Sequence, residues 1–421
     1  MLASDAAILA QQLPSYDSIS PPPNYSSDPI CGEQSIQLAR RTRSRPAGKY
    51  VQKSGSATVL LMDQEEGVLI PAYGRQSTVN GLISLSSPEA VSEVKVKLYG
   101  HMDIVISGGS SHKTTLADYA YTAWKHDPDT SDQSCPSELP FTCMFPFTFK
   151  DSMGREYPLP PSMQVAYPGA SGIYANCTYT LMVKIVKRGF FAQPKKIVIP
   201  LNYYPRTRAP MLMNPSPDLF SDVKVSPEEW HQTMGVVQSR KPAVTPPVQC
   251  SFFIPAVKVF ALSDTIHFHV QLTGPLVSLR QLVYSKLSKS TGSPHASAKL
   301  APKIRVYLMR QVAADVGGQK GYKNITLGEG TLSPRPPPIV TSSIPTFEGQ
   351  SEDSLDWEGE VRCDEDVTRG TPGFITRDLM VKDFLVLSVS PPDPTKSNLM
   401  STQVTVPIRL VTESAETWRE D

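Results

Sequence analysis

Apolar residues occupy every second position over two long stretches of this chain. In the first stretch these positions include Val94, Val96, Leu98, Phe141, Cys143, Phe145, Phe147, Phe149, Tyr179, Leu181, Val183, Ile185, Ile197, Ile199 and Leu201. In the second they include Phe252, Ile254, Ile266, Phe268, Val270, Leu272, Ile304, Val306, Leu308, Val404, Val406, Ile408 and Leu410. A period of two is typical of strands that bury one face. The pattern predicts an all-β fold of two immunoglobulin-like β-sandwich domains, at residues 55–205 and 248–412.

The segments around these stretches lack the period of two. Residues 1–54 are rich in Ser, Pro, Gln and Arg, which predicts a disordered N-terminal arm. We expect residues 206–247 to form an inter-domain linker with a short helix near Glu228–His231. We expect residues 413–421 to form a C-terminal tail. Residues 333–360 carry three consecutive prolines and several acidic residues, which predicts a long exposed loop.

One glycine interrupts a predicted strand. Gly81 lies between the apolar positions Val79 and Ile83. We expect little room for a side chain there.

Composition agrees with a β-rich protein and narrows its partners. The chain has 40 prolines in 421 residues, too many for a helix-rich fold. A net charge of +1 provides no global field that would recruit nucleic acid. We find neither a run of about 20 apolar residues nor a basic segment that would begin a signal peptide. We therefore expect a cytoplasmic protein, whose six scattered cysteines are reduced thiols.

The motifs of common catalytic and metal sites are missing, so we expect a binding protein without a cofactor. There is no G-x-S-x-G nucleophile turn and no H-E-x-x-H metal motif. The glycines and lysine of 108–114 have the wrong spacing for a phosphate loop, and a hairpin turn is the better interpretation. His267 and His269 share one strand face and could together bind a metal. Their alternation with apolar residues places both histidines on a polar strand face, which is the favoured alternative.

The strongest motif lies in the predicted arm. Pro22, Pro23 and Tyr25 form a PPxY element. Such segments favour the extended polyproline helix and dock into the aromatic grooves of WW domains. The alternative is an inert turn in a disordered tail. Leu13, Pro14 and Tyr16 form an LPxY variant, which as a second WW-binding site would raise the effective concentration by tethering.

A basic cluster follows at Arg40–Arg45, and three interpretations compete. It is a solvated linker, a patch attracted to an anionic membrane surface, or a regulatory site. For the last, Arg41, Ser44 and Pro46 have the R-x-x-S-x-P form that 14-3-3 proteins bind after serine phosphorylation.

Several segments resemble the arrestin family. Thr78–Leu85 followed by Val94–Gly100 is similar to the opening strands of the arrestin N-terminal domain. Three further segments are similar to stretches of fungal α-arrestins: Phe141–Phe149, Tyr157–Ser162 and Cys177–Val183. Pro205–Arg208 resembles the segment that ends the arrestin N-terminal domain. In the second domain, Leu262–Ile266 replaces the P-G-E-x-I turn of many arrestins.

The resemblance implies an arrestin-related trafficking adaptor. Such a protein binds a plasma-membrane transporter or receptor as cargo, and its PPxY element brings a HECT-type ubiquitin ligase to that cargo for endocytosis. Pro22, Pro23 and Tyr25 match the ligase-recruiting motif. We expect a non-enzymatic, cytoplasmic protein at the plasma membrane or endosomes. The alternative is an arrestin-fold structural subunit of a trafficking coat that recruits no ligase.

Overall fold

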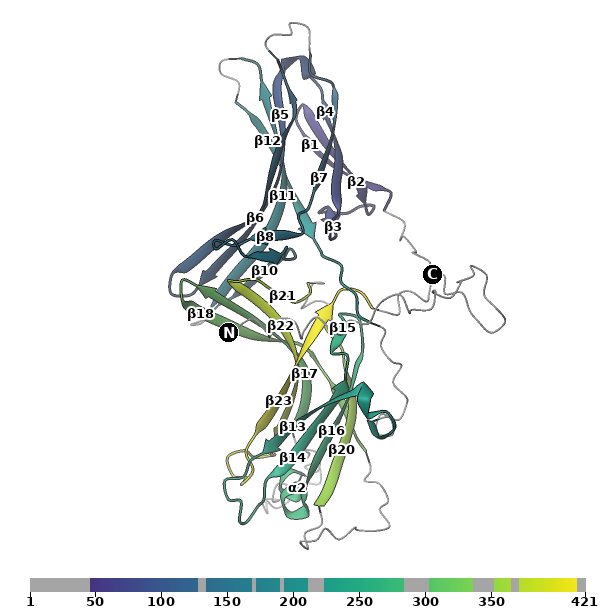
Figure 1. Ribbon diagram of the computed structural model, residues 1–421, viewed down its shortest axis with the longest axis vertical. Coiled ribbons are helices and arrows are strands. Elements are labelled where there is room, and N and C mark those ends of the chain that lie inside the picture. The colour runs from purple at the N-terminus through teal and green to yellow at the C-terminus, as the bar shows by residue number, and fades with distance from the viewer. Residues whose placement is uncertain are drawn as a thin grey trace, which may run out of the picture. The chain divides into compact units, whose positions relative to one another are not determined.

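The computed structural model describes residues 46–127, 134–168, 172–189, 193–210, 223–283, 303–335, 352–364 and 371–414. These residues form two β-sandwich halves, so the predicted all-β fold is confirmed (Figure 1). Among the described residues, no helix is long and apolar enough to cross a membrane.

The first half, Gly48–Tyr203, contains a four-stranded and a six-stranded sheet. The four-stranded sheet has the order β1 (Gly48–Ser54), β2 (Ala57–Gln64), β4 (Thr78–Leu85) and β7 (Glu138–Met144). The second sheet has the order β3 (Ala72–Tyr73), β12 (Lys195–Tyr203), β11 (Ile173–Lys187), β5 (Val91–Ile106) and β6 (Ser110–Lys125), with β10 (Met163–Tyr167) also on β11. A small hairpin joins β8 (Thr148–Lys150) and β9 (Glu156–Pro158), and a 3₁₀ turn spans Pro88–Ala90.

The second half, Trp230–Val411, repeats this plan. Its five-stranded sheet has the order β13 (Trp230–Val237), β14 (Val248–Pro255), β16 (Ile266–Pro275), β20 (Glu352–Val361) and β19 (Thr331–Arg335). The facing sheet has the order β15 (Val259–Ala261), β23 (Thr402–Val411), β22 (Leu379–Ser390), β17 (Lys303–Val316) and β18 (Gln319–Glu329), with β21 (Phe374–Ile375) on β22. Helix α2 (Leu276–Val283) follows β16 directly.

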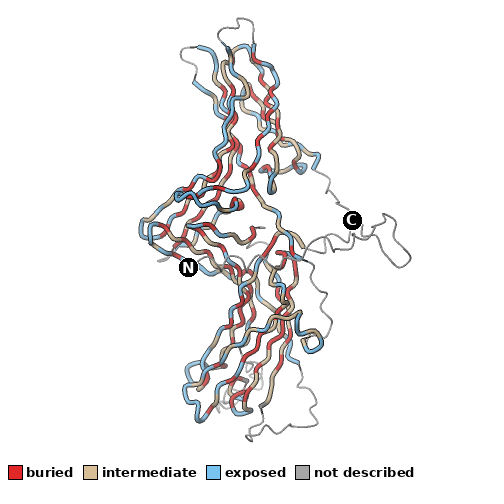
Figure 2. The backbone as a smooth tube through the Cα atoms, in the orientation of Figure 1, coloured by how far each residue is buried: buried red, intermediate tan, exposed pale blue. Residues whose placement is uncertain are grey.

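Burial follows the sequence alternation. Buried and more exposed residues succeed one another along most strands, as Figure 2 shows. Phe145 lies at the centre of an aromatic group with Tyr73, Tyr179 and Tyr203, at ring-centroid distances of 5.0–5.7 Å. The Tyr179 hydroxyl donates to the carbonyl of Pro160 at 2.6 Å, so the one polar atom of this buried side chain has a hydrogen-bond partner.

The two halves share part of one core. Val312, Ala314 and Val316 of β17, with Leu379 and Val381 of β22, belong to the hydrophobic cluster of the first half. Because these side chains come from the second half, separating the halves would expose apolar surface to water.

Three segments that we predicted to be irregular contain strands. Residues 48–54 of the predicted arm form β1, residues 230–237 of the predicted linker form β13, and residues 333–335 and 352–360 of the predicted loop belong to β19 and β20. The short helix expected near Glu228 is a 3₁₀ turn, Pro227–Glu229, that leads into β13. In β1 and β13 apolar residues do not occupy every second position, so periodicity did not reveal these strands. In β20, Leu355 and Trp357 do alternate with polar residues, but the prolines and acidic residues of the segment led us to predict a loop. In the predicted tail, the carbonyl of Glu413 accepts from the amide of Ala209.

The phosphate-loop-like segment is a hairpin turn, as expected. Gly108 and Gly109 join β5 to β6 with φ of 113° and 99°, a backbone region that favours glycine. The neighbouring carbonyl of Ser107 accepts from Gln319 Nε2 at 3.0 Å, which joins this turn to the turn between β17 and β18.

Candidate functional site

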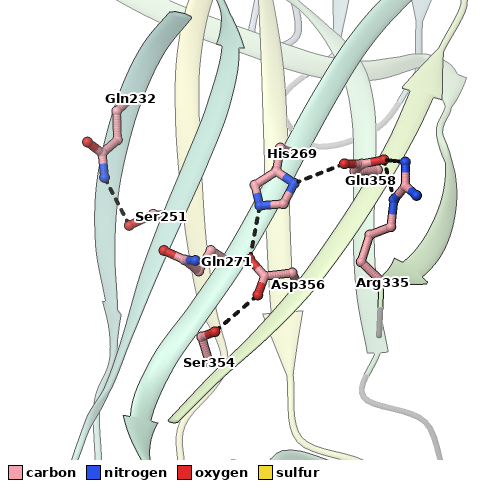
Figure 3. Close-up of polar contacts among 8 residues, drawn as sticks. All are labelled: Gln232, Ser251, His269, Gln271, Arg335, Ser354, Asp356 and Glu358. Carbon is pink, nitrogen blue, oxygen red and sulfur yellow. Dashed lines mark hydrogen bonds and ion pairs between the residues drawn. The ribbon is translucent and has the colours of Figure 1, made fainter. Parts of the chain in front are cut away.

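Polar side chains gather on the outer face of the five-stranded sheet. Along β16, Phe268, Val270 and Leu272 face the core, so His269 and Gln271 point to the opposite face. We call the group around them the His269 cluster. Its members are His269 and Gln271 of β16, Ser354, Asp356 and Glu358 of β20, and Arg335 of β19 (Figure 3).

Strand register brings these residues together. In the β16–β20 ladder His269 lies opposite Glu358, and Gln271 lies opposite Asp356. In the β19–β20 ladder Arg335 lies opposite Asp356. Residues on one face of adjacent strands are close enough to interact directly or diagonally. The cluster therefore ties the edge strand β19 to β20, and β20 to β16.

His269 lies between two carboxylates. Its Nε2 is 3.0 Å from Oδ1 of Asp356, and its Nδ1 is 3.9 Å from Oε1 of Glu358. Its ring also lies 5.7 Å from that of Phe253 on β14. The side chains of His269 and Asp356 are only 1% and 3% exposed. A substrate in solution has no direct path to either group, so this Asp–His pair lacks the access that acid–base catalysis requires.

The outer members complete the network. Asp356 also accepts from Gln271 Nε2 at 3.0 Å and from the Ser354 hydroxyl at 3.1 Å. Glu358 forms an ion pair with Arg335, whose side chain is 41% exposed. The cluster thus runs from the buried imidazole of His269, through the carboxylate of Glu358, to the guanidinium of Arg335 at the surface.

Hydrogen bonding determines the charge state of Asp356. Burial alone would raise the pKa of this carboxyl group. Hydrogen bonds from His269, Gln271 and Ser354 and the electrostatic interaction with His269 together outweigh burial, so the pKa of Asp356 lies below its ordinary value of 3.8. Asp356 is therefore a buried carboxylate at neutral pH, and hydrogen bonds to a charged group are strong.

Because the pKa of Asp356 is lowered on folding, its contribution to stability is present above the unfolded value and is lost as pH falls through the folded value. We expect Asp356→Asn to lower the free energy of unfolding by about 1.5–3 kcal/mol at pH 7. The difference from wild type should shrink below about pH 4. Urea unfolding between pH 3 and 7 measures this. Asp118→Asn, in an exposed pair with Lys97, is the control. A difference that stays constant with pH would contradict the assignment.

The metal hypothesis for His267 and His269 receives no support. No three His, Cys, Asp or Glu side chains are grouped to hold a metal ion in the part of the chain that the structure describes. His269 is on the polar face, as expected, but it is buried there.

We missed the partners of His269 because Asp356 and Glu358 lie some 90 positions along the chain. The alternation of Ser354, Asp356 and Glu358 with Leu355 and Trp357 could have indicated their strand.

The predicted binding motifs of the arm lie outside the described residues. This holds for Pro22, Pro23 and Tyr25, for Leu13, Pro14 and Tyr16, and for Arg41 and Ser44. Only Pro46 of these site residues is described, and it is exposed two residues before β1 begins.

Comparison with known proteins identifies no relative of this chain. No protein-family model matches the chain, and no curated protein matches its sequence.

Proposed function

We propose that this protein is a non-enzymatic adaptor that links a membrane transporter or receptor to a WW-domain HECT ubiquitin ligase, for ubiquitin-dependent endocytosis. The observation that carries the proposal is the PPxY element of Pro22, Pro23 and Tyr25. The two β-sandwich halves support it, because they agree with the fold that the resemblance to arrestins implies.

Ligase recruitment is favoured because the PPxY segment loses little conformational entropy when it binds. Consecutive prolines already favour the extended helix that WW grooves accept, so little conformational entropy is lost on binding. The tyrosine ring adds apolar contact area and a hydroxyl group. Leu13, Pro14 and Tyr16 supply a second, weaker element that acts through tethering.

The roles of the remaining partners follow from charge. Arg40–Arg45 is a local patch for an anionic membrane surface, since the net charge of the whole chain is only +1. Phosphorylation of Ser44 would oppose that attraction and create a 14-3-3 site with Arg41 and Pro46.

A peptide of residues 20–26 is expected to bind a HECT-ligase WW domain at micromolar strength, and Tyr25→Ala to abolish that binding. Isothermal titration calorimetry measures both. Pro21→Ala, just outside the PPxY element, is the matched control and should bind like wild type. Equal binding of the Tyr25→Ala peptide would rule out ligase recruitment through this motif.

The coat-subunit alternative makes a different prediction in cells. Proximity labelling of the intact chain should enrich ligase and transporters, and deletion of residues 1–45 should remove the ligase. That deletion ends before β1, so the described sandwich halves stay whole. Recovery of coat proteins, unchanged by the deletion, would favour the structural subunit.

A further inference from the structure

Strand β13 lies at the edge of the five-stranded sheet, and no other described strand pairs with the outer side of its backbone. It pairs antiparallel with β14, Thr233 opposite Phe252. At the start of this ladder the amide of Ala256 donates to the carbonyl of Glu229 at 2.8 Å. Because hydrogen-bonded pairs alternate in an antiparallel ladder, the odd-numbered residues of β13 bond to β14. The amides and carbonyls of the even-numbered residues therefore point outward: Trp230, Gln232, Met234 and Val236.

The open edge has a defined end. Just beyond β13, the carbonyl of Gln238 accepts from the amide of Met400, and the amide of Arg240 donates to the carbonyl of Asn398. Residues 398–400 thus cover the continuation of the strand. On the core side, a methyl of Val404 from β23 fits against Gly235. In the part of the chain that the structure describes, no backbone hydrogen bond covers the outer side of β13 itself, over Trp230–Val236.

The other long edge strands carry groups that oppose pairing with another strand. Lysine and proline on an edge strand are common means of preventing such pairing. On the other long edge strands of this protein, the lysine, arginine and proline residues are Lys49 and Lys53 on β1, Pro140 on β7, Lys113 and Lys125 on β6, Pro334 and Arg335 on β19, and Lys320 and Lys323 on β18. On β7, moreover, the amide of Thr142 donates to the hydroxyl of Tyr121.

Strand β13 has none of these groups. Its eight residues, WHQTMGVV, include no Lys, Arg, Asp, Glu or Pro. Burial and the nearby Lys258 lower the pKa of His231, which favours its neutral form. Met234 and Val236 are 64% and 42% exposed. An uncharged edge with exposed apolar side chains is suited to accept another strand.

We propose that β13 pairs antiparallel with β13 of a second copy of this chain, about a two-fold axis at Thr233. In this register the outward residues meet one another, Trp230 opposite Val236 and Gln232 opposite Met234 of the other copy. Thr233 faces its own counterpart in a non-hydrogen-bonded pair. The two five-stranded sheets then form one continuous sheet.

A second copy matches this edge because the strand is complementary to itself. Homotypic pairing of a charged strand would set like charges opposite one another, which destabilises a sheet. Here every cross-strand pair is neutral, and each Met234 lies beside an uncharged Gln232. The interface is isologous, so it closes after two copies. It does not depend on the ligase-adaptor role.

Sedimentation equilibrium of the full chain tests the pairing. Wild type is expected to show a concentration-dependent monomer–dimer equilibrium, and Met234→Lys with Val236→Lys to remain monomeric. Both sites are exposed, so circular dichroism and thermal unfolding should match wild type. Val51→Lys on β1, 47% exposed, is the matched control and should dimerise normally. A wild-type chain that stays monomeric, or a dimer that survives both lysines, overturns the proposal.

Disulfide trapping tests the register. In a non-hydrogen-bonded pair the two Cα atoms are about 4.5 Å apart, within the range of a disulfide. Thr233→Cys should therefore give a covalent dimer under mild oxidation. Met234→Cys should not, since Met234 lies diagonal to its own counterpart, roughly 7–8 Å away. Efficient trapping by Met234→Cys and not by Thr233→Cys would exclude this register.

Discussion

Asp383→Ala is expected to lower the free energy of unfolding by about 3–5 kcal/mol, because it leaves a buried guanidinium without its carboxylate. Arg310 of β17 donates to both oxygens of Asp383 on β22, from Nε at 2.7 Å and from Nη2 at 3.0 Å. Its Nη1 donates to the carbonyl of Thr371 at 2.8 Å. The side chains of Arg310 and Asp383 are only 7% and 2% exposed. Urea unfolding followed by circular dichroism measures the loss.

An exposed ion pair provides the control. Lys97 and Asp118 are 2.7 Å apart, but their side chains are 33% and 48% exposed. Asp118→Ala should therefore cost no more than about 1 kcal/mol. If Asp383→Ala costs as little, the pair is not shielded from water. The double change Arg310→Met with Asp383→Leu should recover most of the stability, since it removes both charges and refills the space.

Gly81→Ala is expected to destabilise the first half by about 1–3 kcal/mol through overpacking. Gly81 lies in β4, which is paired on both sides, with Leu61 of β2 and Phe141 of β7 opposite it. A methyl group there would lie 2.3 Å from Cζ of Phe141 and 2.6 Å from the carbonyl oxygen of Leu60. The ring can move only within a packed core, and the carbonyl belongs to the ladder. The midpoint of urea unfolding reports the change.

A second strand glycine separates overpacking from the general effect of adding a methyl group. A methyl group on Gly274 of β16 would meet its nearest atoms at 3.5 Å, an ordinary contact distance. Gly274→Ala should leave the unfolding midpoint nearly unchanged or raise it slightly. Equal losses at Gly81 and Gly274 would show that crowding at Phe141 is not the cause.

Hydrophobic alternation was sufficient to predict both sandwich halves and the tight position at Gly81. A strand that buries one face needs apolar side chains at every second residue, and β11 and β16 show that pattern plainly. Edge strands need fewer of them. Strand β1 has exposed Lys49, Val51 and Lys53 on one side, so its composition resembles that of an arm.

The sequence by itself determined the fold class, the strand-rich halves and the PPxY element, because these depend on local periodicity and on consecutive residues. Tertiary structure alone decided which distant polar groups meet. His269 finds Asp356, and Arg310 finds Asp383, across 87 and 73 positions of the chain. No local pattern encodes such a pairing, since it depends on the register of strands that fold back on one another. The open edge of β13 has the same origin, because whether a strand has one neighbour or two is a property of the sheet.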